Sequence, residues 1–268
     1  MKLTEDIAPT VTNKAKISIG LMLKDYGKRK LVFISAMFAL LCLGSWSQTA
    51  WAAPCIVKNT KDSGPSSLRA CIIIANGSPG TTITFNIKAT DTGKITVGIN
   101  SYWRIQPVTA LPTISASNTI IDGTTQAAFI GGDPNTLGPE IELFGNGAAF
   151  NGLTITSANN TVKGLIIGGF SGVGADGLYI NGGTGNTVTG NYIGTDYQAT
   201  AAQANRYGLV LNNSAASNTI GGTDPLARNV ISGNTYGIWI TGVGTNNHLI
   251  QGNYIGTNAA GTAPVANS

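Results

Sequence analysis

From Thr81 onward, short runs of β-branched and aliphatic residues alternate with glycine, asparagine and aspartate. This pattern predicts strands separated by tight turns. Four of the runs begin with a glycine and continue as an alternating apolar strand, at Gly152, Gly177, Gly208 and Gly237. Eight to ten residues after each glycine, an asparagine begins a second strand, at Asn160, Asn186, Asn218 and Asn247. The chain therefore contains an internal repeat of 25 to 31 residues.

Repeats of this length without helical periodicity indicate the coils of a parallel β-helix, in which stacked coils bury one continuous core. Equivalent side chains then form columns about 4.8 Å apart, in which asparagines can bond to their neighbours. Corners need a backbone conformation that glycine and asparagine tolerate. We place such corners at three glycines, each followed by asparagine, in the pairs Gly190–Asn191, Gly233–Asn234 and Gly252–Asn253.

The hexapeptide GNYIGT occurs at residues 190–195 and again at 252–257. A phosphate-binding loop would run into the N-terminus of a helix, whereas strands and further turns flank this segment. We interpret it as a corner with its following strand, and NVISGN as the variant corner between the two copies. An insertion at Thr223–Arg228 leaves open whether a repeat is one coil with a long loop or a coil and a half.

The segment before the repeats predicts a short cap. CIVKNT, which begins at Cys55, has the composition of a strand. The following SGPSSLRACIIIANG predicts a helix that Ser66 or Ser67 caps and that Gly77 ends. We assign residues 53–268 to one all-β domain, with residues 53–80 as its N-terminal cap and residues 81–268 as its coils.

Residues 1–52 have the features of a signal peptide with an extended n-region. GKRK supplies positive charge, Leu31–Gly44 is apolar but short for a membrane span, and AWA at 50–52 is a small-x-small cleavage site. The sequence does not show whether translation starts at Met1 or at Met22. We expect export, with no stable membrane span after cleavage.

Charge does not indicate a nucleic-acid partner. The formal net charge is +4. Residues 1–52 hold seven Lys/Arg and three acids, so the rest of the chain holds nine of each and is neutral. No basic patch remains on which to argue nucleic-acid binding.

Export would leave Cys55 and Cys71 in an oxidising compartment, where they are candidates for a disulfide. Such a bond would add about 3 kcal/mol in the chain-entropy model. The sequence does not show whether their Cβ atoms lie close enough for a disulfide, so it does not decide whether the bond forms.

The chain resembles the secreted or surface-exposed right-handed parallel β-helix repeat proteins of bacteria. The resemblance rests on an ordered series of segments: NTKDSGPSSLRACIIIAN, IDGTTQ, IELFGNGAAFNGLTI, NTVKGLIIGGFSG, NTVTGNYIGTD and NTIGGTDPLARNVISGN. SLRACI is similar to the CSLREA-type segment that opens many of these proteins. The resemblance covers Cys55–Ser268 and implies a right-handed single-stranded, pectate-lyase-like β-helix at the bacterial cell surface or secreted from the cell. It supplies no catalytic residue.

This chain departs from those proteins at two places. They usually carry aspartate where this chain has Phe144, so any role of that carboxylate is absent here. They also continue with more coils, whereas this chain stops at GTAPVANS, where the next glycine-led strand is due. We therefore expect that the C-terminal end is truncated.

We expect an exported, non-catalytic module that is adhesin-like or structural at the cell surface. Glycan binding is a hypothesis for this module, since core or groove packing explains each of its aromatic residues equally well. Its partner would be an extracellular polysaccharide or a host or cell-surface glycan. The candidates for stacking on sugar rings are Tyr192, Tyr254 and Trp239. The exact ligand and the oligomeric state stay open.

The alternative is a polysaccharide lyase or glycoside hydrolase of the β-helix type. A hydrolase needs two facing carboxylates, and a lyase needs an acidic calcium cluster with a basic residue nearby. The first catalytic candidates are Asp176, Asp196 and Arg206, although the repeat equivalent of Asp196 is Asn258.

We expect no cofactor and no metal site, with calcium as the alternative. GVGADGLYI at 172–180 partly matches a calcium-binding nonapeptide, but Ser171 breaks its glycine pair and no second copy follows. His248 has no histidine or free cysteine partner and is expected at a surface or corner position.

Overall fold

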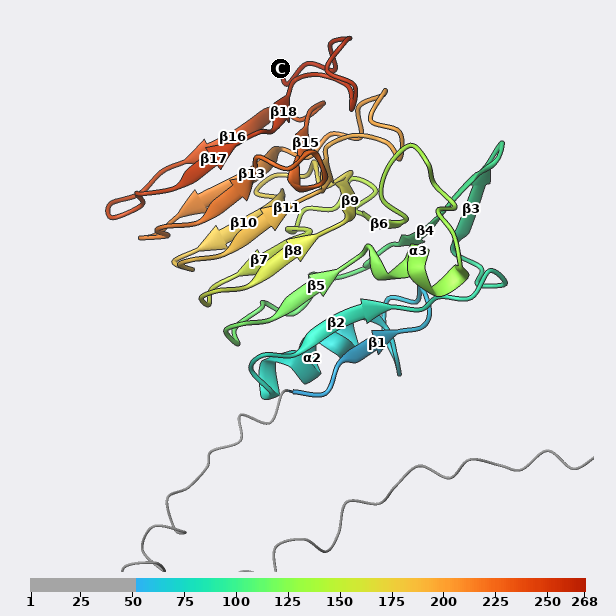
Figure 1. The fold of residues 1–268 in the computed structure, drawn as a ribbon. Coiled ribbons are helices and arrows are strands. Elements are labelled where there is room, and N and C mark those ends of the chain that lie inside the picture. Colours follow the sequence, from blue (N-terminus) through green and yellow to red (C-terminus); the bar gives the residue numbers. More distant parts are fainter. Residues whose placement is uncertain (1–51) are drawn as a thin grey trace, which may run out of the picture. The chain divides into compact units, whose positions relative to one another are not determined.

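Short strands dominate residues 52–268, the part of the chain that the computed structural model describes, and they form three sheets (Figure 1). Sheet A contains, in order, β1 (Cys55–Val57), β2 (Thr82–Phe85), β5 (Ile120–Asp122), β8 (Thr161–Lys163), β11 (Thr187–Thr189), β14 (Thr219–Gly221) and β17 (Leu249–Gln251). Sheet B contains β18 (Tyr254–Ile255), β15 (Val230–Ile231), β12 (Tyr192–Ile193), β9 (Leu165–Gly168), β6 (Ile141–Phe144), β4 (Asn100–Ile105) and β3 (Lys94–Val97). Sheet C contains β16 (Tyr236–Ile240), β13 (Tyr207–Asn212), β10 (Asp176–Asn181) and β7 (Leu153–Ile155).

From β7 onward the chain visits sheets C, A and B in turn, once per repeat. We call each such set of three strands a rung; the rungs are β7–β8–β9, β10–β11–β12, β13–β14–β15 and β16–β17–β18. Neighbouring rungs pair in parallel, and in the described residues only β3 and β4 pair antiparallel. The predicted all-β fold with parallel strands is therefore confirmed.

The core lies between the sheets, where equivalent apolar side chains stack from rung to rung. One column in sheet A consists of Ile83, Ile121, Val162, Val188 and Ile220, all buried and in direct register. A single rung cannot bury its apolar side chains alone, so each depends on its neighbours.

Asparagine side chains form a ladder at the corner before sheet A. Asn160 donates its N–H to Oδ1 of Asn186 at 2.8 Å, and Asn186 donates its N–H to Oδ1 of Asn218, also at 2.8 Å. Asn218 donates its N–H to Nδ1 of His248 at 3.3 Å. The prediction that Asn247 holds this fourth position was wrong, because the register of β17 places His248 there instead.

A second ladder, at the corner between sheets A and B, contains Asn191, Asn229 and Asn253. A third, at the corner between sheets B and C, contains Asn205, Asn234 and Asn267. Gly233–Asn234 is a corner, as predicted, with φ +72° at Gly233, but it is a different corner from the one that the two GNYIGT copies form. The residues that replace Gly190–Asn191 in the intervening rung are Arg228–Asn229, since Val230 pairs with Tyr192 and Tyr254.

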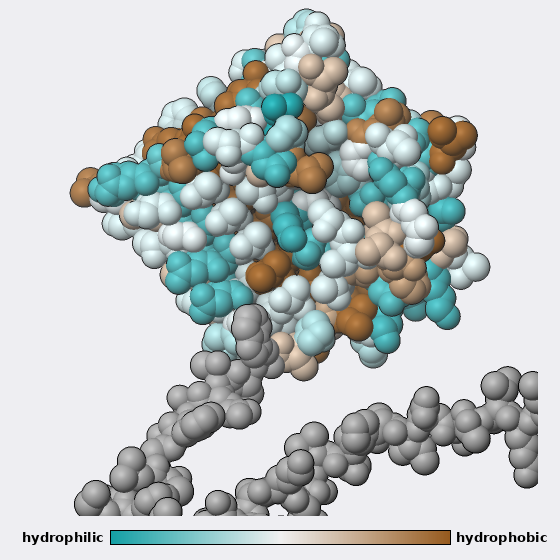
Figure 2. All heavy atoms as spheres, viewed as in Figure 1, coloured by the Kyte–Doolittle hydropathy of each residue, from teal (hydrophilic) through white to brown (hydrophobic). Residues whose placement is uncertain are grey.

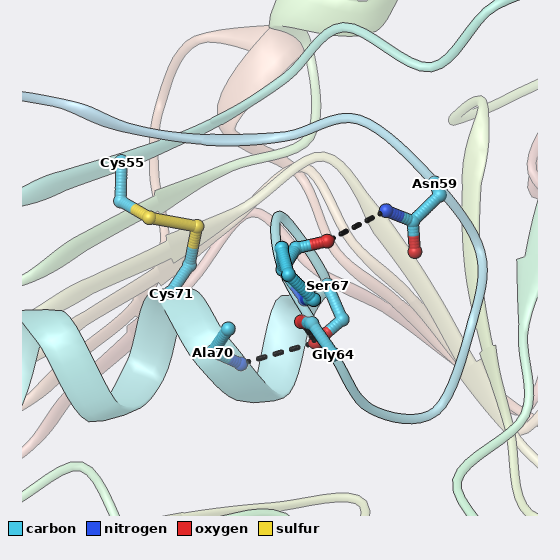
Figure 3. The surroundings of a disulfide bond; sticks show 7 residues. Cys55, Asn59, Gly64, Ser67, Ala70 and Cys71 are labelled. Carbon is cyan, nitrogen blue, oxygen red and sulfur yellow. Dashed lines mark hydrogen bonds between the residues drawn. A yellow bond between two sulfur atoms is a disulfide. The ribbon is translucent and has the colours of Figure 1, made fainter.

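The N-terminal cap has the predicted form. Helix α2 (Leu68–Gly77) begins after Ser67, whose side chain accepts the N–H of Ala70 at 3.2 Å. Cys71 on this helix forms a disulfide with Cys55 on β1, which settles the state of the two cysteines (Figure 3). The buried face of the helix consists of Leu68, Cys71, Ile72 and Ala75.

Three features outside the regular strands of the stack were not predicted. They are the β3–β4 hairpin, the short helix α3 (Thr125–Ile130) and the 3-10 helix η1 (Pro225–Ala227). Since η1 lies between β14 and β15, the insertion at Thr223–Arg228 is a long corner within one rung. The repeat is therefore one rung with a long loop, not a rung and a half.

The edge rung exposes apolar side chains. Ile240, Val243 and Leu249, on and between β16 and β17, are exposed. Figure 2 shows brown, hydrophobic residues along this upper left edge, whereas much of the remaining visible face is white or teal. These strands are edge strands in the order of their sheets, so no further strand covers their outer side in residues 52–268.

The signal-peptide prediction concerns residues 1–52 and so lies, except for Ala52, outside the described residues. Within residues 52–268, no helix has the length and apolar character needed to cross a membrane.

Candidate functional site

The outer face of sheet C carries a cluster of aromatic side chains, Tyr207, Tyr236 and Trp239. Side chains alternate between the two faces of a strand. Leu209 and Leu211 belong to the core, so Val210 between them points outward, and Val210 is in register with Trp239. The two tyrosines contact Trp239 and therefore lie on the same outer face.

The three rings form a compact platform. Tyr207 and Tyr236 stack with ring centroids 4.9 Å apart, and the Trp239 ring lies 5.1 Å from Tyr207 and 5.6 Å from Tyr236. Tyr236 is 45% exposed and Trp239 is 40% exposed. Aromatic rings of this kind present an apolar face and a polar edge to a ligand, which suits the C–H face and the hydroxyl groups of a sugar ring.

Arg206 extends this platform with a positive charge. Its guanidinium carbon lies 4.7 Å from the centroid of the Tyr207 ring. No carboxylate among residues 52–268 forms a salt bridge with it. A stacked guanidinium retains its in-plane N–H donors, and these match a carboxylate or a pair of hydroxyl groups. Arg206 is thus available to a polar ligand that contacts the aromatic rings.

Asp176 lies beside this cluster, because β10 places it in register with Tyr207. Its side chain is buried, and its Oδ1 has no hydrogen-bond partner in the described part of the chain. Burial raises the pKa of Asp176 to about 6, and the positive charge of Arg206 offsets part of that rise. The structure thus brings together three predicted residues, Asp176, Arg206 and Trp239.

Asp196, the third catalytic candidate, lies elsewhere and has structural partners. Its Oδ1 accepts the N–H groups of Thr200 at 2.7 Å and Ala201 at 3.1 Å, which closes a loop after β12. Asn258 accepts two N–H groups in the equivalent loop after β18. The repeat equivalence of Asp196 and Asn258 is therefore confirmed, and a carboxylate is not needed for this loop.

Tyr192 and Tyr254 occupy one column of sheet B, separated by Val230. Tyr192 is half-buried, and its hydroxyl donates to the carbonyl of Leu137 at 2.9 Å. The guanidinium carbon of Arg228 lies 4.1 Å from the centroid of the Tyr254 ring, so this cation covers one face of that ring. Trp239 is therefore the most accessible of the three predicted stacking residues.

No group of three or more His, Cys, Asp or Glu side chains that could hold a metal ion occurs in residues 52–268. His248 lies at the end of the first asparagine ladder. Its role there is to accept a backbone hydrogen bond.

The sequence analysis named Trp239 as a stacking candidate but did not predict that the rings of Tyr207 and Tyr236 touch it. It also missed Asp133 and Glu140, which line a cleft at the corner between sheets A and B. They belong to an insertion outside the repeat, so no periodic signal marks them. Comparisons with protein-family models and with curated proteins found no match to this chain.

Proposed function

We propose that the protein is an exported, non-catalytic, right-handed parallel β-helix, an adhesin-like module at the cell surface that binds an extracellular polysaccharide. The parallel pairing of successive rungs supports the β-helix. We assign a right-handed helix because connections between parallel strands of one sheet are strongly biased toward the right-handed crossover. Export rests on the signal-like leader and agrees with the Cys55–Cys71 disulfide, a bond typical of oxidising compartments.

The observation that carries the binding proposal is the exposed platform of Tyr207, Tyr236 and Trp239 with Arg206 beside it. Isolated hydrophobic residues are common on protein surfaces, but clustered and rigidly packed aromatic rings are characteristic of binding sites. Arg206 adds a donor that favours an acidic sugar. The ligand therefore stacks on the rings and presents a carboxylate or hydroxyl groups to Arg206.

A polysaccharide lyase or hydrolase is the alternative, and the raised pKa of Asp176 beside Arg206 is the observation in its favour. A hydrolase requires a second carboxylate roughly 5 to 9.5 Å away. The positions that continue the column of Asp176 in sheet C hold Tyr207 and Tyr236 rather than a second acid. The surface therefore fits binding better than acid–base catalysis by two carboxylates.

Affinity electrophoresis of the full chain tests binding, with polygalacturonate, alginate, xylan, cellulose and mannan as probes. We expect retardation by at least one of them, and about tenfold weaker binding for Trp239→Ala, equivalent to 1.4 kcal/mol. Phe129→Ala is the matched control, since Phe129 is another exposed aromatic residue, on α3. Absence of retardation by all five probes would refute the proposal.

Assays of chain cleavage on the same polysaccharides, with and without calcium, test the alternative. We expect no cleavage. Cleavage by the wild-type protein that is lost in Asp176→Asn would establish an enzyme in place of a binding module.

A further inference from the structure

A cleft of about 590 Å³ lies at the corner between sheets A and B. Two insertions at this corner supply opposite walls. One, between β5 and β6, contains α3, Asp133 and Glu140; the other, between β14 and β15, contains η1. The two rungs between these insertions turn through short corners at Gly164 and Gly190, which also line the cleft. The cleft therefore spans four successive strands of sheet A.

The short corners keep this space open. Gly190 has φ +65°, a left-handed conformation that disfavours other residues, and a Cβ atom there would lie 2.9 Å from the carbonyl oxygen of Leu226 on η1. Backbone rather than side chain therefore forms this part of the floor. The volume is in the range of about 300 to 1,000 Å³ that is typical of small-molecule sites.

Glu140 is the most unusual polar group of the cleft. It is only 6% exposed, and no cation forms a salt bridge with it in residues 52–268. The negative charge of Asp133 acts on this carboxyl group. A buried carboxylate without a cation is costly, so Glu140 is expected to take up a proton or to bind a ligand.

The pKa of Glu140 is close to neutral pH. Burial, together with the negative charge of Asp133, raises this pKa to about 7. Near neutral pH the carboxyl group of Glu140 therefore both donates and accepts hydrogen bonds. Asp133 is additionally held in place, since its Oδ1 accepts the N–H of Asn135 at 3.0 Å.

Two cations line other parts of the cleft, and both are anchored. Nζ of Lys163 lies 2.9 Å from Oδ2 of Asp122, which neutralises its charge. Nε of Arg228 donates to the carbonyl of Gly252 at 3.0 Å, and the guanidinium packs on Tyr254. With the carboxyl group of Glu140 protonated, the charges of Asp122, Asp133, Glu140, Lys163 and Arg228 sum to zero.

Apolar groups complete the lining. The Tyr192 ring is fixed by the bond from its hydroxyl to Leu137, and Pro139, Pro225 and Leu226 add apolar surface. The cleft thus combines a rigid ring, hydrogen-bonding groups of both kinds and no strong net charge.

We propose that this cleft is a second ligand site, separate from the aromatic platform, and that it takes a neutral sugar residue of a glycan. A neutral sugar offers hydroxyl groups that both donate and accept, together with an apolar C–H face. A metal cation would find only two carboxylates and no third His, Cys, Asp or Glu ligand in the described residues. An anionic ligand would face the carboxylate of Asp133, and Lys163 is already paired with Asp122.

Titration calorimetry of the full chain with cellohexaose, xylohexaose, mannohexaose and maltohexaose tests the proposal. We expect at least one to bind, with affinity reduced at least tenfold in Glu140→Gln. Leu226→Glu provides a second test that does not depend on a buried position, since Leu226 is 87% exposed and lines the cleft. The added carboxylate is expected to reduce binding of the same sugar.

Two controls separate this site from other effects. Asp196→Asn reproduces the residue of the equivalent loop, and Val243→Glu adds a carboxylate at an exposed apolar residue outside the cleft. Both variants should bind the neutral hexasaccharide like the wild type. If no neutral hexasaccharide binds at millimolar concentration, the cleft proposal is wrong. It is also wrong if binding survives both cleft variants or is lost in either control. None of these results decides whether the aromatic platform binds a polysaccharide, because affinity electrophoresis tests that proposal separately.

Discussion

Replacement of Asn191 by alanine should remove a large part of the stability of this fold. Asn191 is fully buried in the second asparagine ladder. Its Oδ1 accepts the N–H of Leu165 at 3.0 Å, and its Nδ2 donates to the carbonyls of Val162 and Thr189, each at 3.0 Å. The same Nδ2 lies 3.0 Å from Oδ1 of Asn229. One side chain therefore joins three successive rungs.

The magnitude follows from the groups that alanine would leave unpaired. The N–H of Leu165 and the carbonyl of Val162 are buried groups of the preceding rung, and each costs about 1 to 3 kcal/mol when it loses its partner. Asn191→Ala should thus lower the free energy of unfolding by about 4 kcal/mol. Domains are typically stable by only about 5 to 15 kcal/mol, so this is a large fraction of the total.

Urea unfolding followed by circular dichroism measures this loss. The midpoint should fall while the slope with urea stays near that of the wild type, which would show that the same surface unfolds. Asn246→Ala is the matched control, because Asn246 is exposed and its side chain makes no hydrogen bond within residues 52–268. It should change stability by less than about 0.5 kcal/mol. A loss below about 1 kcal/mol in Asn191→Ala would refute the reasoning that the ladder stabilises the stack.

Three further predictions concern stability. The pKa of Glu140 is raised from 4.5 to about 7, so between these pH values the folded chain holds a proton that the unfolded chain releases, and the free energy of unfolding falls as the pH rises. Urea unfolding should give a value about 3 kcal/mol lower at pH 8 than at pH 4, and this difference should be absent in Glu140→Gln. Equal curves for the two proteins would contradict it. Replacement of Cys55 and Cys71 by serine should lower the free energy of unfolding by about 3 kcal/mol, seen as a lower melting temperature. An unchanged melting temperature would show that the disulfide of the cap does not contribute to stability. His248→Asn should raise the free energy of unfolding by about 1 kcal/mol, measured by thermal unfolding, because asparagine shortens the 3.3 Å hydrogen bond from the N–H of Asn218 and removes the unpaired Nε2. A destabilised variant would argue against this extension of the asparagine ladder.

The rungs could be predicted from the sequence because stacking imposes a repeated pattern. Each strand of sheet C must bury the same alternate positions as its neighbour. Gly177 and Gly208, the second residues of β10 and β13, therefore begin similar apolar runs and lie in adjacent rungs. The α2 helix was equally predictable, since its buried residues recur at helical spacing and Ser67 caps it. A local pattern specifies local structure in both cases.

Register at the corners could not be predicted in the same way. Asn247 and His248 are adjacent, and only the pairing of β17 with β14 shows which of them continues the ladder. Gly233–Asn234 has the same letters as Gly190–Asn191 but lies at a different corner. Glycine and asparagine suit every left-handed corner, so composition alone does not distinguish one corner from another.

The cleft was beyond sequence reasoning for a related reason. Glu140 and Asp133 meet through the path of a non-repetitive insertion, and the opposite wall comes from another insertion about 90 residues later, at residues 222–229. Periodicity describes what successive rungs share, whereas this site depends on two insertions that the repeat does not contain. A search for the site from sequence would have to start at the interruptions of the repeat.

The two copies of GNYIGT show the same distinction within one motif. Both place glycine and asparagine at the corner between sheets A and B and a tyrosine in one column of sheet B. The first copy lines the cleft through Gly190 and Tyr192, because long insertions stand on either side of its rung. In the second copy, Arg228 of the preceding rung covers the ring of Tyr254. The motif therefore determines the corner, and the neighbouring rungs determine whether that corner can bind a ligand.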